Sequence, residues 1–268
     1  MPELPEIEVI KNKLKTLILN DPIKYAYITP RILAYPKIPS EKLPIPENTT
    51  ISDISSKGKY LIFELSDKSK IILHLRISGR ISLEHYNSTA FILTFKNAPD
   101  ISVIDPNLYA RIWYITANDN INTACPEITK LGIEPFDNDF NAKYLKSVIA
   151  NRRCGIKTIL TNQKIIAGIG NSYADEILFR AKISPQRKCK DISDTDIKKL
   201  AEIIPEYLRS IIDYDNIVVD HYLHSEMMEF NENYDFRVHN KSICKCGTNI
   251  CMEKTNNRNT FWCPNCQT

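Results

Sequence analysis

The stretch "KYLIFELSDKSKIILHLR" at residues 59–76 contains two short β-rich runs, "KYLIFEL" and "KIILHLR", separated by the turn residues 66–69. Two similar runs follow, "AFILTFK" at 90–96 and "ARIWYIT" at 110–116. Short strands of this composition, bounded by turn residues, are typical of a β-sandwich or a flattened barrel. We therefore predict an all-β region that begins near residue 51.

Helical patterns lie on both sides of this region. After Pro5, which suits a first helical turn, apolar residues recur at helical spacing: Ile7, Ile10, Leu14, Leu17 and Ile18. Further along, Ser193 can cap a helix, despite Pro205 within it, whose apolar face is Ile197, Leu200, Ala201, Ile204, Leu208 and Ile211. Residues 213–240 have no clear period, and we interpret them as a loop.

The chain of 268 residues is long enough for two domains with separate cores. The segment "CPEITKLGIEPFDND" at 125–139 has two prolines, a glycine and several acids with little periodicity, which is typical of a linker. We predict a multidomain α+β fold: a helix and sandwich at 1–125, a hinge at 126–140, a helical domain at 141–240 and a terminal hairpin at 241–268.

Charge and hydropathy indicate a soluble protein with a basic end. The net charge of +3 lies entirely in residues 241–268, which have four basic residues and one acid. No run of about 18 apolar residues is present, and the first residues lack the basic-then-apolar order of a signal peptide. We expect an intracellular protein that does not enter membranes.

Five of the eight cysteines lie in the last 25 residues. Without an export signal, such a cluster favours metal binding over disulfides. The spacing predicts one structural Zn²⁺ held at about 2.3 Å by four thiolates, from Cys244, Cys246, Cys263 and Cys266. Because the gap between the first two is shorter than usual, Cys251 or His239 stays open as the fourth ligand. Uncoordinated reduced thiols are the other alternative.

A hairpin this short buries too little surface to fold alone, so the metal is expected to supply its folding free energy. Its tip, "KTNNRNTFW" at 254–262, is expected to hold Arg258 outward, where a guanidinium suits a phosphate oxygen. A solvated surface arginine is the equal alternative.

Five segments occur in a fixed order along the chain: "PELPEIE" at 2–8, "KGKYLIFEL" at 57–65, "HLRISG" at 74–79, "AGIGNSYADEILF" at 167–179 and the cysteine hairpin. Together they resemble the formamidopyrimidine-DNA glycosylase/endonuclease VIII family of DNA repair enzymes. The first segment resembles the bacterial formamidopyrimidine type, whereas "NNRNTFWCPNCQ" resembles vertebrate Nei-like members.

The resemblance implies a helix and β-sandwich, a hinge, a helix-two-turn-helix domain and a zinc hairpin. It also implies a monomer that grips damaged DNA, double-stranded or single-stranded, in the cleft between the domains.

The resemblance further implies that removal of Met1 leaves Pro2 as a secondary-amine nucleophile. An α-amino group titrates at about 7.7–8.0, well below the roughly 10.4 of lysine, so part of it is unprotonated at neutral pH. Attack on C1′ of the damaged nucleotide expels the base and forms an iminium, after which β- and δ-elimination cut the strand.

The resemblance gives Glu3 the proton transfers on the opening sugar, and it gives Glu6 a part in ordering the site. An acid in a first helical turn is also explained by the helix dipole alone. Lys59 is implied to contact the phosphates around the extruded nucleotide, with Lys57 as a rival, although a strand lysine is more often solvated.

Two more residues match phosphate contacts of the family. Asn171 follows the turn Gly168-x-Gly170 and opens a helix; as an ordinary helix cap it would need no ligand. His74 lies in a β-rich run, where a histidine is more often only packed.

Three residues match the positions with which the family fills the gap left by the extruded base: Ile77, Asn107 and Tyr109. The family commonly has Met, Arg and Phe there. Asn107 lacks the forked cation that Arg offers to the opposite cytosine, so discrimination of the opposite base is expected to be relaxed. Strand alternation alone would instead make Ile77 and Tyr109 core residues.

The leading hypothesis is a bifunctional glycosylase/AP lyase acting on oxidised bases. An endonuclease VIII-type enzyme for oxidised pyrimidines or single strands is the first alternative. A zinc-stabilised protein that binds damaged DNA without catalysis is the second, and the presence of Pro2, Glu3, Glu6 and Lys59 together argues against it.

Overall fold

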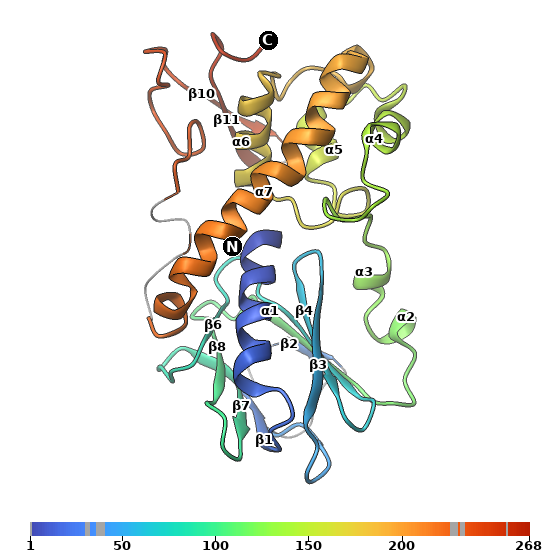
Figure 1. Ribbon diagram of the computed structural model, residues 1–268, viewed down its shortest axis with the longest axis vertical. Helices are drawn as coiled ribbons and strands as arrows, with labels where there is room; N and C mark the ends of the chain where they lie inside the picture. Colours follow the sequence, from blue (N-terminus) through green and yellow to red (C-terminus); the bar gives the residue numbers. More distant parts are fainter. Residues whose placement is uncertain (1, 30–32, 36–40, 226–229, 231–233, 256) are drawn as a thin grey trace. The chain divides into compact units, whose positions relative to one another are not determined.

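The computed structural model describes residues 2–29, 33–35, 41–225, 230, 234–255 and 257–268. It divides into two compact units (Figure 1). Unit 1 comprises residues 1–130 and 212–232, and unit 2 comprises residues 131–211 and 233–268. The division after Lys130 falls inside the segment predicted as a hinge; the four-part division itself stays a prediction.

Unit 1 is a helix packed on a β-sandwich. Helix α1 spans Leu4–Ile18 and lies against strands β3 and β4 (Figure 1). Pro5 lies in its first turn, and the buried residues Ile7, Ile10, Leu14 and Ile18 form its inner face, which confirms the predicted amphipathic helix.

The sandwich has two sheets, so the flattened barrel is excluded. A five-stranded sheet has the order β2-β9-β5-β4-β3, and a four-stranded sheet has the order β1-β7-β8-β6. Their strands are β1 Ile23–Ile28, β2 Leu33–Tyr35, β3 Ile51–Lys57, β4 Tyr60–Leu65, β5 Lys70–His74, β6 Arg80–Ser82, β7 Thr89–Phe95, β8 Ile101–Ile104 and β9 Arg111–Ile115. The β-rich run 59–76 becomes β4 and β5, which pair with each other at the centre of the larger sheet.

Unit 2 is helical and carries a terminal hairpin. Short helices α2 Ile121–Ala124 and α3 Pro126–Thr129 precede it, and its own elements are α4 Ala142–Ile149, α5 Ile156–Leu160, α6 Asn171–Ala181, η1 Cys189–Asp191 and the first part of α7 Asp194–Leu223. The antiparallel strands β10 Cys251–Thr255 and β11 Arg258–Trp262 form the hairpin.

Helix α7 begins where the sequence predicted but ends later. Ser193 caps it as predicted, because its hydroxyl accepts the N–H of Asp196 at 3.1 Å. The interpretation of residues 213–240 as a loop is wrong for its first part, because α7 continues to Leu223. Buried residues keep helical spacing there, but one of them is the polar Asp215, which hides the apolar period. Residues 226–229 and 231–233 lie outside the described part of the chain.

None of the helices in the described part of the chain is both long and apolar enough to cross a membrane.

Candidate catalytic site and metal centre

The first catalytic candidates lie where α1 begins. Glu3 is the N-cap residue, and its backbone N–H donates to Oε2 of Glu6 at 2.8 Å, so the two acids form a capping box. Both are buried, with 3% and 6% of their surface exposed, and Pro2 beside them is half-buried. Met1, whose removal the nucleophile requires, lies outside the described residues.

Lys59 reaches the same place from the turn between β3 and β4. This turn passes through Gly58, whose φ of +58° favours glycine. The ammonium nitrogen of Lys59 lies 3.8 Å from Oε2 of Glu3, and the residue is only 6% exposed. The separation is too long for a hydrogen bond, but attraction between opposite charges is strong in a buried setting. The rival Lys57 ends β3 one residue before that turn.

A buried carboxylate beside a cation, directly after a proline that can become an N-terminal amine, has the parts required for acid–base and nucleophilic chemistry. The structure therefore brings Pro2, Glu3, Glu6 and Lys59 into one neighbourhood, although they come from two segments far apart in sequence. Neither sequence periodicity nor composition indicates that Lys59 faces Glu3.

His74 ends β5 and is buried, with its ring edge against Tyr60 at 4.5 Å between centroids. Burial, followed by the charges of Arg76 and Lys59, lowers the pKa of His74 to about 3. Its Nδ1 accepts the backbone N–H of Arg76 at 3.0 Å, so the neutral ring carries its proton on Nε2. As a neutral donor His74 still suits a phosphate oxygen, but its role as a DNA contact stays a prediction.

The three residues matched to the gap-filling positions lie on two connections between the sheets. Residues 75–79 lead from β5 in the larger sheet to β6 in the smaller one, and residues 105–110 lead from β8 in the smaller sheet to β9 in the larger one. Gly79 makes the first connection tight, since an added Cβ would lie 2.3 Å from the carbonyl oxygen of Leu75.

Ile77 and Tyr109 are exposed at 67% and 53%, so the alternative that they belong to the sandwich core is wrong. Asn107 is exposed as well. Strand alternation fails here because both residues lie in connections between sheets, where no strand period applies. We refer to Ile77, Asn107 and Tyr109 as the tip residues.

A buried acid that sequence reasoning missed joins the two connections. Asp105 is fully buried; its Oδ1 accepts the hydroxyl of Ser78 at 2.5 Å and the N–H of Asn107 at 3.2 Å, and its Oδ2 accepts the N–H of Ala110 at 2.6 Å. One carboxylate therefore holds both segments that carry the tip residues. A single Asp before Pro106 gives no sequence signal beyond a turn.

In unit 2 the turn through Gly168 and Gly170 opens α6 as predicted, but Asn171 is not its cap. Gly170 is the N-cap, and Nδ2 of Asn171 instead donates to the carbonyl oxygen of Asn259 at 2.8 Å. Arg258 is the exposed residue before Asn259 in β11. Asn171 and the hairpin segment with Arg258 are therefore neighbours, which the sequence separation did not indicate.

The buried side chain of Lys157 also holds strand β11. Lys157 in α5 is 3% exposed; its Nζ lies 2.6 Å from Oδ1 of Asp175, 2.9 Å from Oγ1 of Thr260 and 3.4 Å from the carbonyl oxygen of Asn259. Asp175 is fully buried in α6, and its Oδ2 is hydrogen-bonded to Nδ1 of His239 at 2.7 Å. This network was also missed, because a lone lysine in an apolar helix has no distinctive spacing.

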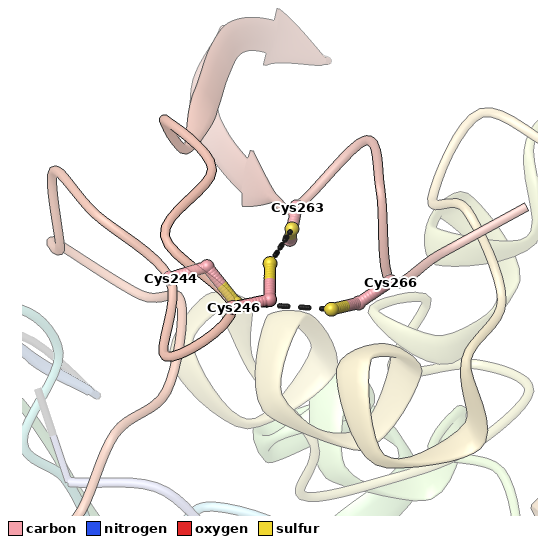
Figure 2. Close-up of side chains that lie close together, drawn as sticks. All are labelled: Cys244, Cys246, Cys263 and Cys266. Atoms are coloured by element: carbon pink, nitrogen blue, oxygen red, sulfur yellow. Dashed lines mark hydrogen bonds between the residues drawn. The ribbon is translucent and has the colours of Figure 1, made fainter.

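The four predicted metal ligands come together. The sulfurs of Cys244, Cys246, Cys263 and Cys266 all lie within 4.8 Å of one another. Figure 2 shows them pointing inward, two from the segment before β10 and two from the turn after β11. Cys244 to Cys266 measures 3.9 Å and Cys246 to Cys263 measures 3.6 Å.

These separations fit zinc, because a tetrahedron with Zn–S bonds of about 2.3 Å has S–S edges of about 3.8 Å. The open alternatives for the fourth ligand are wrong: Cys251 lies within β10 outside the cluster, and His239 is paired with Asp175. The group can therefore hold a metal ion through four cysteines.

Comparison with known proteins agrees along the whole chain. Residues 1–112 match the formamidopyrimidine-DNA glycosylase N-terminal domain, and residues 131–222 match the formamidopyrimidine-DNA glycosylase H2TH domain. A formamidopyrimidine-DNA glycosylase of Prochlorococcus marinus (strain MIT 9301) is 32% identical over 291 residues, with both chains fully covered.

Solved structures of the Lactococcus lactis protein named FPG are similar as well. A point mutant in complex with DNA containing Fapy-dG is 28% identical with a TM-score of 0.84, covering 99% of both chains. The wild-type protein in complex with DNA containing an oxidised pyrimidine is 27% identical with a TM-score of 0.83, again covering 99% of both.

Proposed function

The chain belongs to the formamidopyrimidine-DNA glycosylase/endonuclease VIII family, and from that membership we propose that it removes oxidised bases from DNA by a covalent mechanism at Pro2. It is a DNA glycosylase, and damaged DNA is its partner.

The proposed nucleophile is the secondary amine of Pro2 once Met1 has been removed. Its nitrogen lone pair attacks C1′ of the damaged nucleotide, the bond to the base breaks, and the base leaves with the bonding electrons and takes up the proton that the Pro2 nitrogen loses. Glu3 delivers a proton to the sugar ring oxygen as the ring opens, leaving an iminium between Pro2 and C1′. The iminium accepts electrons during β- and δ-elimination, which break the two phosphate ester bonds in turn.

The observation that carries this proposal is the buried approach of Lys59 to Glu3 at 3.8 Å beside the start of α1. A protein that only binds DNA has no need of a buried acid and cation next to its N-terminal amine. In the proposal, Glu6 fixes the backbone of Glu3, while Lys59 and the Nε2–H of His74 contact phosphate oxygens around the extruded nucleotide.

For unit 2 we propose phosphate contacts by Asn171 and Arg258, supported by the bond from Asn171 to the backbone beside Arg258. The four-cysteine group is proposed to hold one structural Zn²⁺ that keeps the hairpin folded. The enzyme is expected to act as a monomer and to work inside the cell, where the DNA is.

The choice of lesion can be compared with that of a relative. The Lactococcus lactis relative has been solved with DNA containing Fapy-dG and with DNA containing an oxidised pyrimidine. From these two complexes we propose that this enzyme accepts both oxidised purines and oxidised pyrimidines. A panel of oligonucleotides with single lesions, as duplex and as single strand, gives the order of preference.

Borohydride trapping tests the central proposal. Reduction of the iminium to an amine should link the protein to abasic DNA, and peptide mapping should place the link at the N-terminal peptide. A protein that retains Met1 should give no link, because the nitrogen of Pro2 is then an amide. A link that persists with the N-terminus blocked would move the nucleophile to a lysine such as Lys59 and overturn the proposal.

A further inference from the structure

Two cysteines outside the metal cluster lie side by side in unit 2. The sulfurs of Cys154 and Cys189 are 3.9 Å apart, although the residues are 35 positions apart in the chain. Cys154 precedes α5 and is partly exposed, whereas Cys189 begins η1 and is buried. Neither residue belongs to the proposed glycosylase site.

The backbone places these residues directly opposite each other. Gly155 and Lys188 form an antiparallel bridge, and the N–H of Cys189 donates to the carbonyl oxygen of Cys154 at 3.0 Å. Residues opposite each other in such a hydrogen-bonded pair have Cα atoms about 5.5 Å apart. That value lies within the range of about 4.4–6.8 Å that a disulfide requires.

The close approach is built into the sequence. A Cβ atom at Gly155 would lie 2.8 Å from the carbonyl oxygen of Pro185, so only glycine lets the two segments meet at this point. Two further backbone bonds flank the cysteines, from Ile156 N–H to Arg187 at 2.9 Å and from Lys190 N–H to Arg152 at 3.0 Å. These backbone bonds hold the two segments together on both sides of the cysteines, so the two sulfurs are kept close to each other.

We propose that Cys154 and Cys189 form a site of reversible oxidation, at which hydrogen peroxide converts the two thiols into a disulfide. The Cys154 thiolate attacks one peroxide oxygen, the O–O bond breaks, and hydroxide leaves and is protonated to water. The sulfenic acid on Cys154 is then attacked by the sulfur of Cys189, which releases a second water as the S–S bond forms. Two thiols and one peroxide thus give one disulfide and two waters.

The order of attack follows from the surroundings of the two thiols. Burial, followed by the adjacent Cys154, raises the pKa of Cys189 to about 12, so Cys189 is the weaker nucleophile until oxidation of Cys154 removes the neighbouring thiolate charge that contributes to this shift. Cys154 is the one that peroxide can reach. Once Cys154 is oxidised, Cys189 is the thiol in contact with it. Formation of the disulfide then competes with further oxidation of Cys154 to the irreversible sulfinic acid.

Because the backbone bonds are already present, the disulfide is expected to stabilise the native unit without rearranging it. It closes a loop between positions 35 apart and restricts the unfolded chain.

The test uses the full-length, zinc-loaded protein treated with increasing hydrogen peroxide. Peptide mapping by mass spectrometry should find the peptide with Cys154 linked to the peptide with Cys189 and lighter by two hydrogens, and dithiothreitol should reverse the link. The melting temperature of the oxidised protein should rise by at least about 3 °C. Cys154→Ser and Cys189→Ser should abolish both changes, whereas Cys125→Ser, at a buried cysteine in unit 1, should leave both intact.

Two results would overturn the proposal. One is sulfinic acid on Cys154 while Cys189 is still a free thiol. The other is the absence of the link at peroxide concentrations that already release zinc. The mapping reports on the cysteines directly, so either result is visible whether or not the variants are stable.

Discussion

At the residue scale, Asp105 is a buried carboxylate that fixes two exposed segments of the chain. It accepts hydrogen bonds from Ser78, Asn107 and Ala110, and these segments carry the exposed tip residues. Its side chain is fully buried. Its effect on function is therefore expected to act through the position of Ile77 and Tyr109.

Asp105→Ala should lower the free energy of unfolding by about 1–3 kcal/mol, because buried donors lose their acceptor. It should also weaken base extrusion more than lyase activity on a preformed abasic site, where no base has to be extruded. Urea unfolding and the fluorescence of 2-aminopurine beside the lesion measure the two effects. Asp100→Ala, at a partly exposed acid that accepts from Thr94, is the matched control. Equal effects of the two variants would show that Asp105 has no positioning role.

His74 predicts a pH dependence of stability. Its pKa is about 3 in the folded protein and about 6.5 in the unfolded chain, so between these values the unfolded state binds one proton more. The free energy of unfolding should therefore fall as the pH drops below 6.5, by at most about 1.4 kcal/mol per pH unit from this residue. His74→Gln should flatten the curve measured by urea unfolding between pH 5 and 7.5. His85→Gln, at a more exposed histidine, should keep the steeper slope; identical curves for both variants would contradict the assignment.

Asn107 predicts a relaxed choice of the opposite base. Its amide lacks the forked cation of arginine, and the residue is exposed. We expect nearly equal excision rates opposite all four bases. Asn107→Arg should introduce a preference for cytosine of about 1–3 kcal/mol, the range of a good bidentate contact. A strong preference in the unmodified protein would count against this alignment of residues 105–110.

At the scale of elements, the terminal hairpin is held in two ways, by the four cysteines and by unit 2's own helices. Cys263→Ser should lose the metal and the affinity for DNA together, because Arg258 depends on the folded hairpin. Zinc content by a chromogenic chelator and DNA binding by fluorescence anisotropy measure both. Normal DNA binding by the metal-free protein would refute the structural role of the metal.

Lys157→Met tests the contribution of the helices of unit 2 separately from that of the four cysteines. It should leave the carboxylate of Asp175 buried with one partner fewer, and breaking a buried ion pair typically costs about 3–5 kcal/mol. The zinc should stay bound while the affinity for DNA falls. Lys146→Met, which removes an exposed pair with Asp194, should cost about 0–1 kcal/mol by urea unfolding. Loss of zinc from Lys157→Met would mean that the cysteine cluster and the Lys157 network do not hold the hairpin independently.

The elements also show what sequence alone can predict. Helical spacing in 4–18 and 197–211, the β-rich runs and the cysteine spacing are local patterns, and each gave its element or cluster correctly. The contacts of Lys59, Asp105 and Lys157 depend on which segments meet in three dimensions, and no local period encodes that. Asp215 shows the limit within one helix: a buried polar residue interrupted the apolar pattern, and the last turns of α7 were missed.

At the scale of the whole molecule, the resemblance and the physical patterns contributed different information. Spacing predicted a sandwich, helices and a metal hairpin, while the resemblance assigned chemistry to Pro2, Glu3 and the tip residues. Only the resemblance placed Ile77 and Tyr109 at the surface, and their exposure agrees with it.

The two connections joined by Asp105 have a further consequence for how such an enzyme can diversify. The carboxylate bonds to one side-chain hydroxyl and two backbone N–H groups and to no tip side chain, so those side chains can be exchanged without disturbing the sheets. Single substitutions at positions 77, 107 and 109 can thus change the lesion preference during evolution with little loss in the free energy of unfolding. Mutational tolerance should therefore be highest at the tip residues and drop abruptly at Asp105, which is only two residues from Asn107 and four from Tyr109.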